Sequence, residues 1–150
     1  GVTAAVSGFT GGSLQNPSYR GNHKGHYEAV EITYDPAIIS YQELLDIFWI
    51  NIDPFDDRGQ FCDKGFSYLS AIFAADESQQ QLATASRAKV VAQFSDKKVI
   101  TPIFAGNKFW PVEEYHQDYY LKNPLRYKYY RYGCGRDARL QDIWGDRSAH

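Results

Sequence analysis

The chain has 150 residues, with 16 basic and 18 acidic side chains, a formal net charge of −2 and 43% hydrophobic residues. This length and composition fit one folded domain and exclude a disordered chain. No apolar run approaches the roughly 18 residues that span a membrane, and the near-neutral charge argues against a dedicated nucleic-acid binder. The two cysteines are too few for a disulfide framework. We expect one monomeric domain over residues 1–150, without membrane or nucleic-acid partners.

The first residues of the sequence indicate whether the domain is complete. The sequence contains no methionine and opens with Gly1. We expect residues upstream of Gly1 to have been removed or left out, which would make the domain incomplete at its N-terminus. A targeting signal would lie in that part, so a cytoplasmic location is the default expectation.

Apolar and polar residues alternate in the segments that we predict to be strands. Val2–Phe9 runs into a Thr-Gly-Gly turn signal, and a polar loop separates it from His26–Tyr34. Ser67–Ala74 and Val99–Ala105 are the later strands.

Capping signals and apolar spacing predict the helices. Ser40 and Glu43 form a capping box ahead of a helix that runs to Ile52, before an Asp-Pro pair. A second helix covers Asp76–Phe94, and a short third helix covers Glu113–Leu121.

The alternation of strands and helices predicts an α+β fold. We expect a two-layer α/β sandwich, with a ferredoxin-like mixed sheet and helices on one of its faces. Residues 122–150 are rich in aromatic residues and arginine but have little periodicity, so we expect a long irregular C-terminal tail.

Glu28 is a candidate acid. It shares a strand face with Val30, Ile32 and Tyr34, so the pattern places a carboxyl among apolar side chains. Desolvation would raise its pKa, and a carboxylic acid that stays protonated near neutral pH can donate a proton. The alternative is a glutamate at the edge of the strand that reaches water.

The loop that enters the third predicted strand holds Cys62, Asp63 and Tyr68, next to Gly65. Glycine-bearing loops are a common place for site residues, and a tyrosine hydroxyl suits a polar group bound in an apolar pocket. A turn-forming aspartate and a core tyrosine are the alternative. Because Asp63 would disfavour a Cys62 thiolate, we interpret Cys62 as structural or a bystander. The alternative is a thiol relay between Cys62 and Cys134.

The histidines give a weak case for a metal. His116 stands among tyrosines, and the spacing of His23 and His26, with one distant partner, is poor for zinc. We expect neither a metal nor a bound cofactor.

The tail carries the second cysteine. Cys134 lies between two glycines, with Arg131 and Arg136 nearby to favour its thiolate. A cysteine on a mobile tail suits thiol–disulfide exchange, because the sulfur must travel to its partner. Residues 126–136 could instead bind single-stranded nucleic acid through stacking and charge, but we favour rings that pack on the domain.

Taken together, these motifs resemble those of the type A peptide methionine sulfoxide reductases. The resemblance covers almost the whole chain and keeps the family's order. The matching segments are Gly8–Gly12, Asn16–Arg20, Gly25–Val30, Tyr34–Pro36, Asp63–Ile72, Glu113–Tyr119 and Lys122–Pro124.

The resemblance implies thiol-dependent reduction of methionine-S-sulfoxide, free or in oxidised proteins, to methionine. In the family, a cysteine attacks the sulfoxide sulfur while an acid assists the oxygen, and the cysteine becomes a sulfenic acid. A second cysteine condenses with it to form a disulfide, which thioredoxin reduces. Dithiothreitol can serve as the reductant in place of thioredoxin, and no cofactor is implied.

By the same resemblance, Glu28 is the acid, Tyr68 hydrogen-bonds the sulfoxide oxygen, and Asp63 orients the surroundings of the nucleophile. Cys134 matches the resolving cysteine. Three further residues match positions that line the family's substrate pocket: Phe9, His116 and Tyr119.

The sequence departs from the family's pattern in informative places. Phe9 and Leu69 stand where the family usually has tyrosine and arginine, so one hydroxyl is missing from the oxygen site. The Gly-Cys-Phe-Trp segment, which supplies the family's nucleophile and the aromatic walls around the substrate methyl, is absent; its place would be upstream of Gly1. We therefore expect these 150 residues alone to be inactive. The alternative is a non-catalytic module that binds methionine sulfoxide or hydrophobic peptides.

Overall fold

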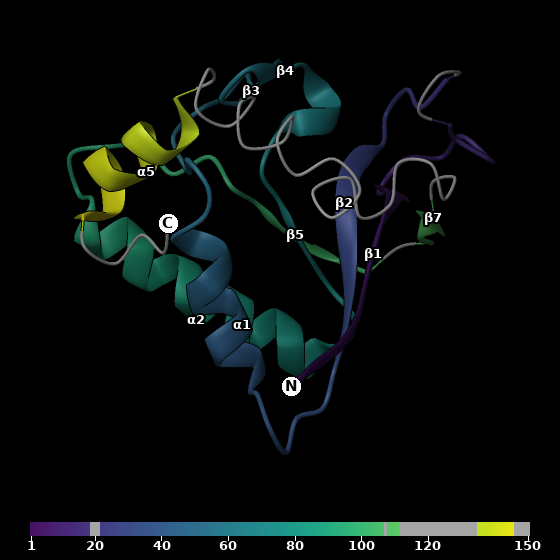
Figure 1. The fold of residues 1–150 in the computed structure, drawn as a ribbon, viewed down its shortest axis with the longest axis horizontal. Coiled ribbons are helices and arrows are strands. Elements are labelled where there is room, and N and C mark those ends of the chain that lie inside the picture. Colours follow the sequence, from purple (N-terminus) through teal and green to yellow (C-terminus); the bar gives the residue numbers. More distant parts are fainter. Residues whose placement is uncertain (19–21, 107, 112–134, 146–150) are drawn as a thin grey trace.

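The computed structural model describes residues 1–18, 22–106, 108–111 and 135–145 (Figure 1). Strands and helices alternate along these residues, as the sequence predicts. In chain order the elements are β1 (Val2–Thr10), β2 (Tyr27–Tyr34), α1 (Tyr41–Trp49), β3 (Gly59–Gln60), β4 (Asp63–Lys64), the 3-10 helix η1 (Phe66–Tyr68), β5 (Ile72–Ala74), α2 (Glu77–Gln93), β6 (Ile103–Ala105), β7 (Trp110–Pro111) and α5 (Arg136–Trp144).

The long pairing of β1 with β2 organises the first part of the chain. The two strands are antiparallel, from Val2 opposite Tyr34 to Thr10 opposite Tyr27. β7 pairs with the other edge of β1, so the sheet order is β2-β1-β7. Because the register of an antiparallel pair fixes which side chains face one another, this pairing sets the position of Glu28.

α1 begins at the predicted capping box. The Ser40 hydroxyl accepts the Glu43 N–H at 3.0 Å, and the Glu43 carboxylate accepts the Ser40 N–H at 3.2 Å. The helix ends at Trp49, earlier than the predicted Ile52. The Trp49 indole N–H donates to the Ser86 hydroxyl of α2 at 2.8 Å, which ties the two helices together.

α2 connects the parallel strands β5 and β6 and packs against both, as a parallel pair requires a crossover. Its predicted cap is confirmed, since the Asp76 carboxylate accepts the Gln79 N–H at 2.8 Å. Arg87 donates from the middle of the helix to the carbonyls of Thr101 at 2.7 Å and Val99 at 2.9 Å. These bonds satisfy backbone acceptors in the segment that leads into β6.

β5 and β6 are much shorter than the predicted strands Ser67–Ala74 and Val99–Ala105. Gly65, with a φ of 126°, leads instead into η1. A 2.6 Å hydrogen bond joins the buried hydroxyls of Ser70 and Thr101, which lie within the two predicted strands. Side-chain bonding and turn geometry thus replace the outer parts of both strands.

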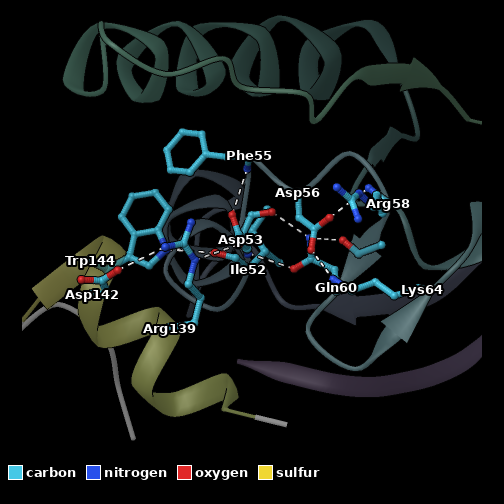
Figure 2. Close-up of polar contacts among 11 residues, drawn as sticks. Ile52, Asp53, Phe55, Asp56, Arg58, Gln60, Lys64, Arg139, Asp142 and Trp144 are labelled. Carbon is cyan, nitrogen blue, oxygen red and sulfur yellow. Dashed lines mark hydrogen bonds and ion pairs between the residues drawn. The ribbon is translucent and has the colours of Figure 1, made fainter.

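Residues 136–144 form the helix α5, where the sequence analysis wrongly predicted an irregular tail. Leu140 is fully buried, and Ile143 and Trp144 are buried as well. The Trp144 indole N–H donates to the Ile52 carbonyl at 2.9 Å, an interaction drawn in Figure 2. The prediction failed because apolar residues over a single turn give too weak a period.

The fold class is α+β, as predicted. The described strands form a three-stranded antiparallel sheet, the β3-β4 hairpin and the parallel β5-β6 pair, rather than one continuous sheet. α1 and α2 lie side by side on one side of β1 and β2 (Figure 1). The core gathers the buried residues Leu45, Trp49, Ile72, Ala83, Val90, Val99, Leu140, Ile143 and Trp144.

Two remaining expectations concern the third predicted helix and the absence of a membrane-spanning segment. The predicted helix over Glu113–Leu121 lies outside the described residues. Within the described part, none of the helices has the length and apolar character needed to cross a membrane.

The packing of α5 makes a testable prediction. Leu140→Ala should lower the free energy of unfolding by about 2–5 kcal/mol, the usual cost of removing a fully buried leucine side chain. Urea denaturation followed by tryptophan fluorescence measures this loss. Asp142→Ala, at a residue whose side chain is 74% exposed, is the control and should change stability by no more than about 1 kcal/mol. Equal effects of both substitutions would contradict the packing of this helix.

Candidate functional site

A row of three side chains crosses the sheet β2-β1-β7. Phe9 stands opposite Glu28 of β2 and opposite Trp110 of β7. Directly opposed residues of an antiparallel pair lie on the same face, so these side chains share one face. Phe9 is fully buried. A Cβ at Gly8 would collide with the Trp110 carbonyl, so the glycine allows β7 its close approach.

The pKa of Glu28 is raised above its usual value, in the direction that the sequence predicts. Desolvation is the main cause and the charge of Asp63 adds to it, while the charge of His23 acts in the opposite direction. The predicted apolar surroundings are only partly present, because Val30 is 56% and Ile32 44% exposed. Glu28 as a residue is also exposed, so desolvation of its carboxyl is partial.

Asp63 is held by the β3-β4 hairpin, in which it pairs with Gln60. The Gln60 side chain is fixed at both ends, since it accepts the Asp53 N–H at 2.9 Å and donates to the Asp53 carbonyl at 2.7 Å. An ion pair between Lys64 and Asp56 closes the same loop. Figure 2 shows these contacts converging on the hairpin.

Asp53 also joins the hairpin loop to α5. Its carboxylate accepts the Phe55 N–H at 3.0 Å and the Arg139 Nε–H at 3.0 Å. The hydrogen bond to Asp53 raises the pKa of the Arg139 guanidinium. Arg139 in turn bonds Asp142 at 3.1 Å, so α5 supports the loop from which β3 and β4 emerge (Figure 2).

Tyr68 ends η1, a turn that packs on β2 through Phe66, whose ring lies 4.8 Å from that of Tyr27. Tyr27 and Phe66 line a hollow of about 360 Å³ together with Phe73 and Phe104. Successive residues of a strand point to opposite faces, so this hollow lies on the face of β2 away from Glu28. It is therefore separate from the acid site.

The turn before β2 places two histidines in different roles. His26 is fully buried; its Nδ1 accepts the Gly12 N–H at 3.2 Å, and its Nε2 donates to the Leu14 carbonyl at 2.7 Å. Neither ring nitrogen of His26 is open to a metal ion. His23 stacks on Phe9, with ring centroids 4.8 Å apart and an interplanar angle of 15°.

Several predicted site residues cannot be placed. His116, Tyr119 and Cys134 lie outside the described residues, so their roles stay predictions. Cys62 is disulfide-bonded, and its interpretation as structural stays a prediction. Within the described ranges, no group of three or more histidine, cysteine or acidic side chains is arranged to hold a metal ion.

The structure thus brings together Phe9, Glu28 and, through its charge, Asp63. It adds Trp110 and His23, which the sequence analysis did not assign to this site. β7 is too short to show a strand period, so Trp110 gave no signal. His23 lies in the turn before β2 and stacks on Phe9. The sequence signal that could have indicated His23 was its closeness to His26. Chemically, a carboxyl with a raised pKa beside the buried Phe9 ring can donate a proton.

Comparisons with known proteins identify the family of the chain. A family model described as peptide methionine sulfoxide reductase matches residues 1–148. Peptide methionine sulfoxide reductase MsrA 2 of Rhizobium meliloti is 44% identical over 149 residues, which is 99% of this chain and 75% of that protein. MsrA 2 of Caulobacter vibrioides is 47% identical over 148 residues, 97% of this chain and 75% of that protein.

Solved structures show the same fold. The reduced form of Mxr1 from Saccharomyces cerevisiae has a TM-score of 0.73 and 27% identity, covering 82% of this chain and 72% of that one. Methionine sulfoxide reductase A of Corynebacterium diphtheriae has a TM-score of 0.70 and 31% identity, covering 83% and 66%. Fold and relatives define an oxidoreductase that acts on methionine sulfoxide. The chain belongs to the peptide methionine sulfoxide reductase family, type A.

The charge of Asp63 makes a prediction about Glu28. A neighbouring negative charge disfavours the carboxylate form, so Asp63→Asn should move the titration midpoint of Glu28 to lower pH. Carbon-13 NMR of the side-chain carboxyls measures the midpoint, with Glu28 assigned as the signal that Glu28→Gln removes. Asp57→Asn, at an exposed position of the same loop, should leave the midpoint unchanged. If neither substitution moves the titration midpoint of Glu28, the electrostatic coupling between Asp63 and Glu28 is refuted.

Proposed function

We propose that this domain reduces the S epimer of methionine sulfoxide and that Glu28 is its acid. The observation that carries the proposal is the raised pKa of Glu28 in a row with the buried Phe9. A carboxyl with a raised pKa holds its proton to higher pH than usual, and it can pass that proton to the sulfoxide oxygen while the sulfur is attacked. Tyr68 donates a second hydrogen bond to that oxygen, and Asp63 orients the surroundings of the nucleophile.

The nucleophile is not supplied by the 150 residues. They contain no Gly-Cys-Phe-Trp string, and the charge of Asp63 beside Cys62 disfavours a Cys62 thiolate. We propose that such a segment, joined ahead of Gly1, brings the attacking thiolate to the face that carries Phe9 and Glu28. The oxygen then passes from the sulfoxide to the cysteine as a sulfenic acid, and methionine is released. The 150 residues alone bind substrate without turnover.

Cys134 is proposed as the resolving cysteine. Its thiol condenses with the sulfenic acid, which releases water and forms a disulfide, and thioredoxin reduces that disulfide by thiol exchange. His116 and Tyr119 are proposed to line the substrate pocket. The working enzyme is then a monomer in the cytoplasm, where thioredoxin keeps thiols reduced, and it acts on free methionine sulfoxide and on oxidised proteins without a cofactor.

The acid role of Glu28 is tested in protein extended ahead of Gly1 with the Gly-Cys-Phe-Trp segment. Glu28→Gln should slow single-turnover reduction of methionine-S-sulfoxide by about ten-fold or more, since general-acid help is typically worth 10²–10⁴. Glu31→Gln is the matched control, because Glu31 is exposed on the other face of the same strand. The R epimer should not react. An unchanged rate in Glu28→Gln would remove the acid role, and binding without any turnover in the extended protein would favour a non-catalytic module.

The resolving role of Cys134 is tested by separating the two half-reactions. Cys134→Ser should leave one turnover of sulfoxide reduction intact and abolish cycling driven by thioredoxin, because the sulfenic acid then lacks its partner thiol. Cys62→Ser is the matched control and should continue to cycle. Loss of cycling in Cys62→Ser with full cycling in Cys134→Ser would reverse the assignment.

A further inference from the structure

We propose that Cys62 is a second recycling cysteine, which takes over the bond to Cys134 from the nucleophile, so that thioredoxin reduces a disulfide between Cys62 and Cys134. The proposal rests on the proposed function and extends its last step. Of the roles that the sequence leaves open for Cys62, the structure favours the thiol relay over a structural or bystander role.

The disulfide of Cys62 has one possible partner within the chain. Cys62 is disulfide-bonded, the described residues contain no free cysteine, and the sequence has two cysteines in all. Cys134 is therefore the partner. A disulfide requires the two Cα atoms to lie about 4–7 Å apart, so the described residues that follow Cys134 should lie close to the turn that carries Cys62.

The start of α5 meets this requirement. Arg136 lies two residues after Cys134, which limits the separation of their Cα atoms to about 7 Å. The guanidinium carbon of Arg136 lies 4.2 Å from the centroid of the Phe61 ring, and Phe61 directly precedes Cys62. The Arg136 Nη1 also donates to the Asn51 carbonyl at 3.2 Å. Neither contact involves a sulfur atom, so both support the pairing independently of the disulfide.

Cys62 is accessible to a protein partner. Together with Phe61 it forms the two-residue turn between β3 and β4, beyond the last pair of Gln60 with Asp63, and Cys62 is exposed. Exposed disulfides are the labile and catalytic ones, whereas structural disulfides resist reduction. In the reducing cytoplasm proposed for this enzyme, disulfides are usually transient. The place of Cys62 thus suits reduction by thioredoxin.

The helix α5 has contacts that hold it in place when the disulfide opens. Leu140 is fully buried, and Arg139 bonds the Asp53 carboxylate at 3.0 Å. The two sulfur atoms therefore stay near one another in the reduced protein. Exchange between groups held together is intramolecular and correspondingly fast, which offsets the unfavourable charge of Asp63 next to Cys62.

The exchange balances without an external oxidant. After Cys134 has condensed with the sulfenic acid, it is bonded to the nucleophile. The Cys62 thiol gives up its proton, and its sulfur attacks the Cys134 sulfur. The bond between Cys62 and Cys134 forms, and the nucleophile leaves as a thiolate. Thioredoxin later supplies two electrons and two protons and becomes a disulfide itself. The nucleophile is thus ready for another sulfoxide before thioredoxin arrives.

The first test uses the 150-residue chain and does not depend on its activity. After oxidation in air, digestion without reductant should give a linked pair of peptides that holds Cys62 and Cys134, detected by mass spectrometry. Thioredoxin, with its reductase and NADPH, should reduce this chain with consumption of one NADPH per disulfide, whereas monomeric Cys62→Ser should consume none. Absence of the linked pair, or a pair that dithiothreitol opens and thioredoxin leaves intact, would overturn the proposal.

The second test counts the methionine formed by the protein extended ahead of Gly1, reduced beforehand, freed of reductant and mixed with excess methionine-S-sulfoxide. The parent should form two methionines per molecule, because the relay frees the nucleophile for a second attack that stops at the sulfenic acid. Cys62→Ser should form one, although it still cycles with thioredoxin, which can attack the first disulfide directly. Asp57→Asn, at an exposed position of the same loop, is the control and should form two.

The count of methionine separates the relay from the proposed function on which it rests. One methionine from the parent, or two from Cys62→Ser, would overturn the relay. No methionine from any of these proteins would count against the proposed function instead, on which the first test does not depend.

Discussion

The arrangement of the second half of the molecule depends on Asp53. Its backbone exchanges hydrogen bonds with the Gln60 side chain, and its nearly buried carboxylate accepts from Phe55 and Arg139. Asp53, a single residue in the loop that follows α1, thus contacts both the hairpin that carries Asp63 and the helix α5. A buried carboxylate needs partners to offset its lost hydration, and here the partners are the Phe55 N–H and the Arg139 guanidinium of α5.

This dependence reaches the candidate site through charge. Asp63 raises the pKa of Glu28 from a different part of the chain, so the acid strength of Glu28 depends on where the hairpin lies. The cross-strand register holds the other side of the site, where Phe9 and Glu28 are fixed opposite one another. The acid site is therefore assembled from independently supported pieces, and a change in α5 has a route to its chemistry through Arg139 and Asp53.

Local signals in the sequence were sufficient to predict the elements that have capping residues or a clear alternation of their own. The caps at Ser40 and Asp76 mark α1 and α2 correctly, and alternation marks β2. Local signals could not predict features that depend on contacts between distant parts of the chain. The helix α5 depends on the burial of Leu140 against distant residues. The two short strands depend on the bond between Ser70 and Thr101. At the site, the direction of the Glu28 shift was predictable, but part of its cause was not. The strand pattern implied apolar neighbours, whereas Val30 and Ile32 are exposed and part of the shift comes from Asp63.

β2 has a consequence for the behaviour of the protein in concentrated solution. Among the described strands it pairs with β1 alone, so no described strand covers its outer edge, next to the exposed Val30 and Ile32. Glu28 and Glu31 act there as gatekeepers, because like charges on two copies oppose edge-to-edge association. The raised pKa that suits Glu28 to donate a proton also means that acidification weakens its part in this protection. Acidification thus removes part of the charge that protects this edge of the sheet.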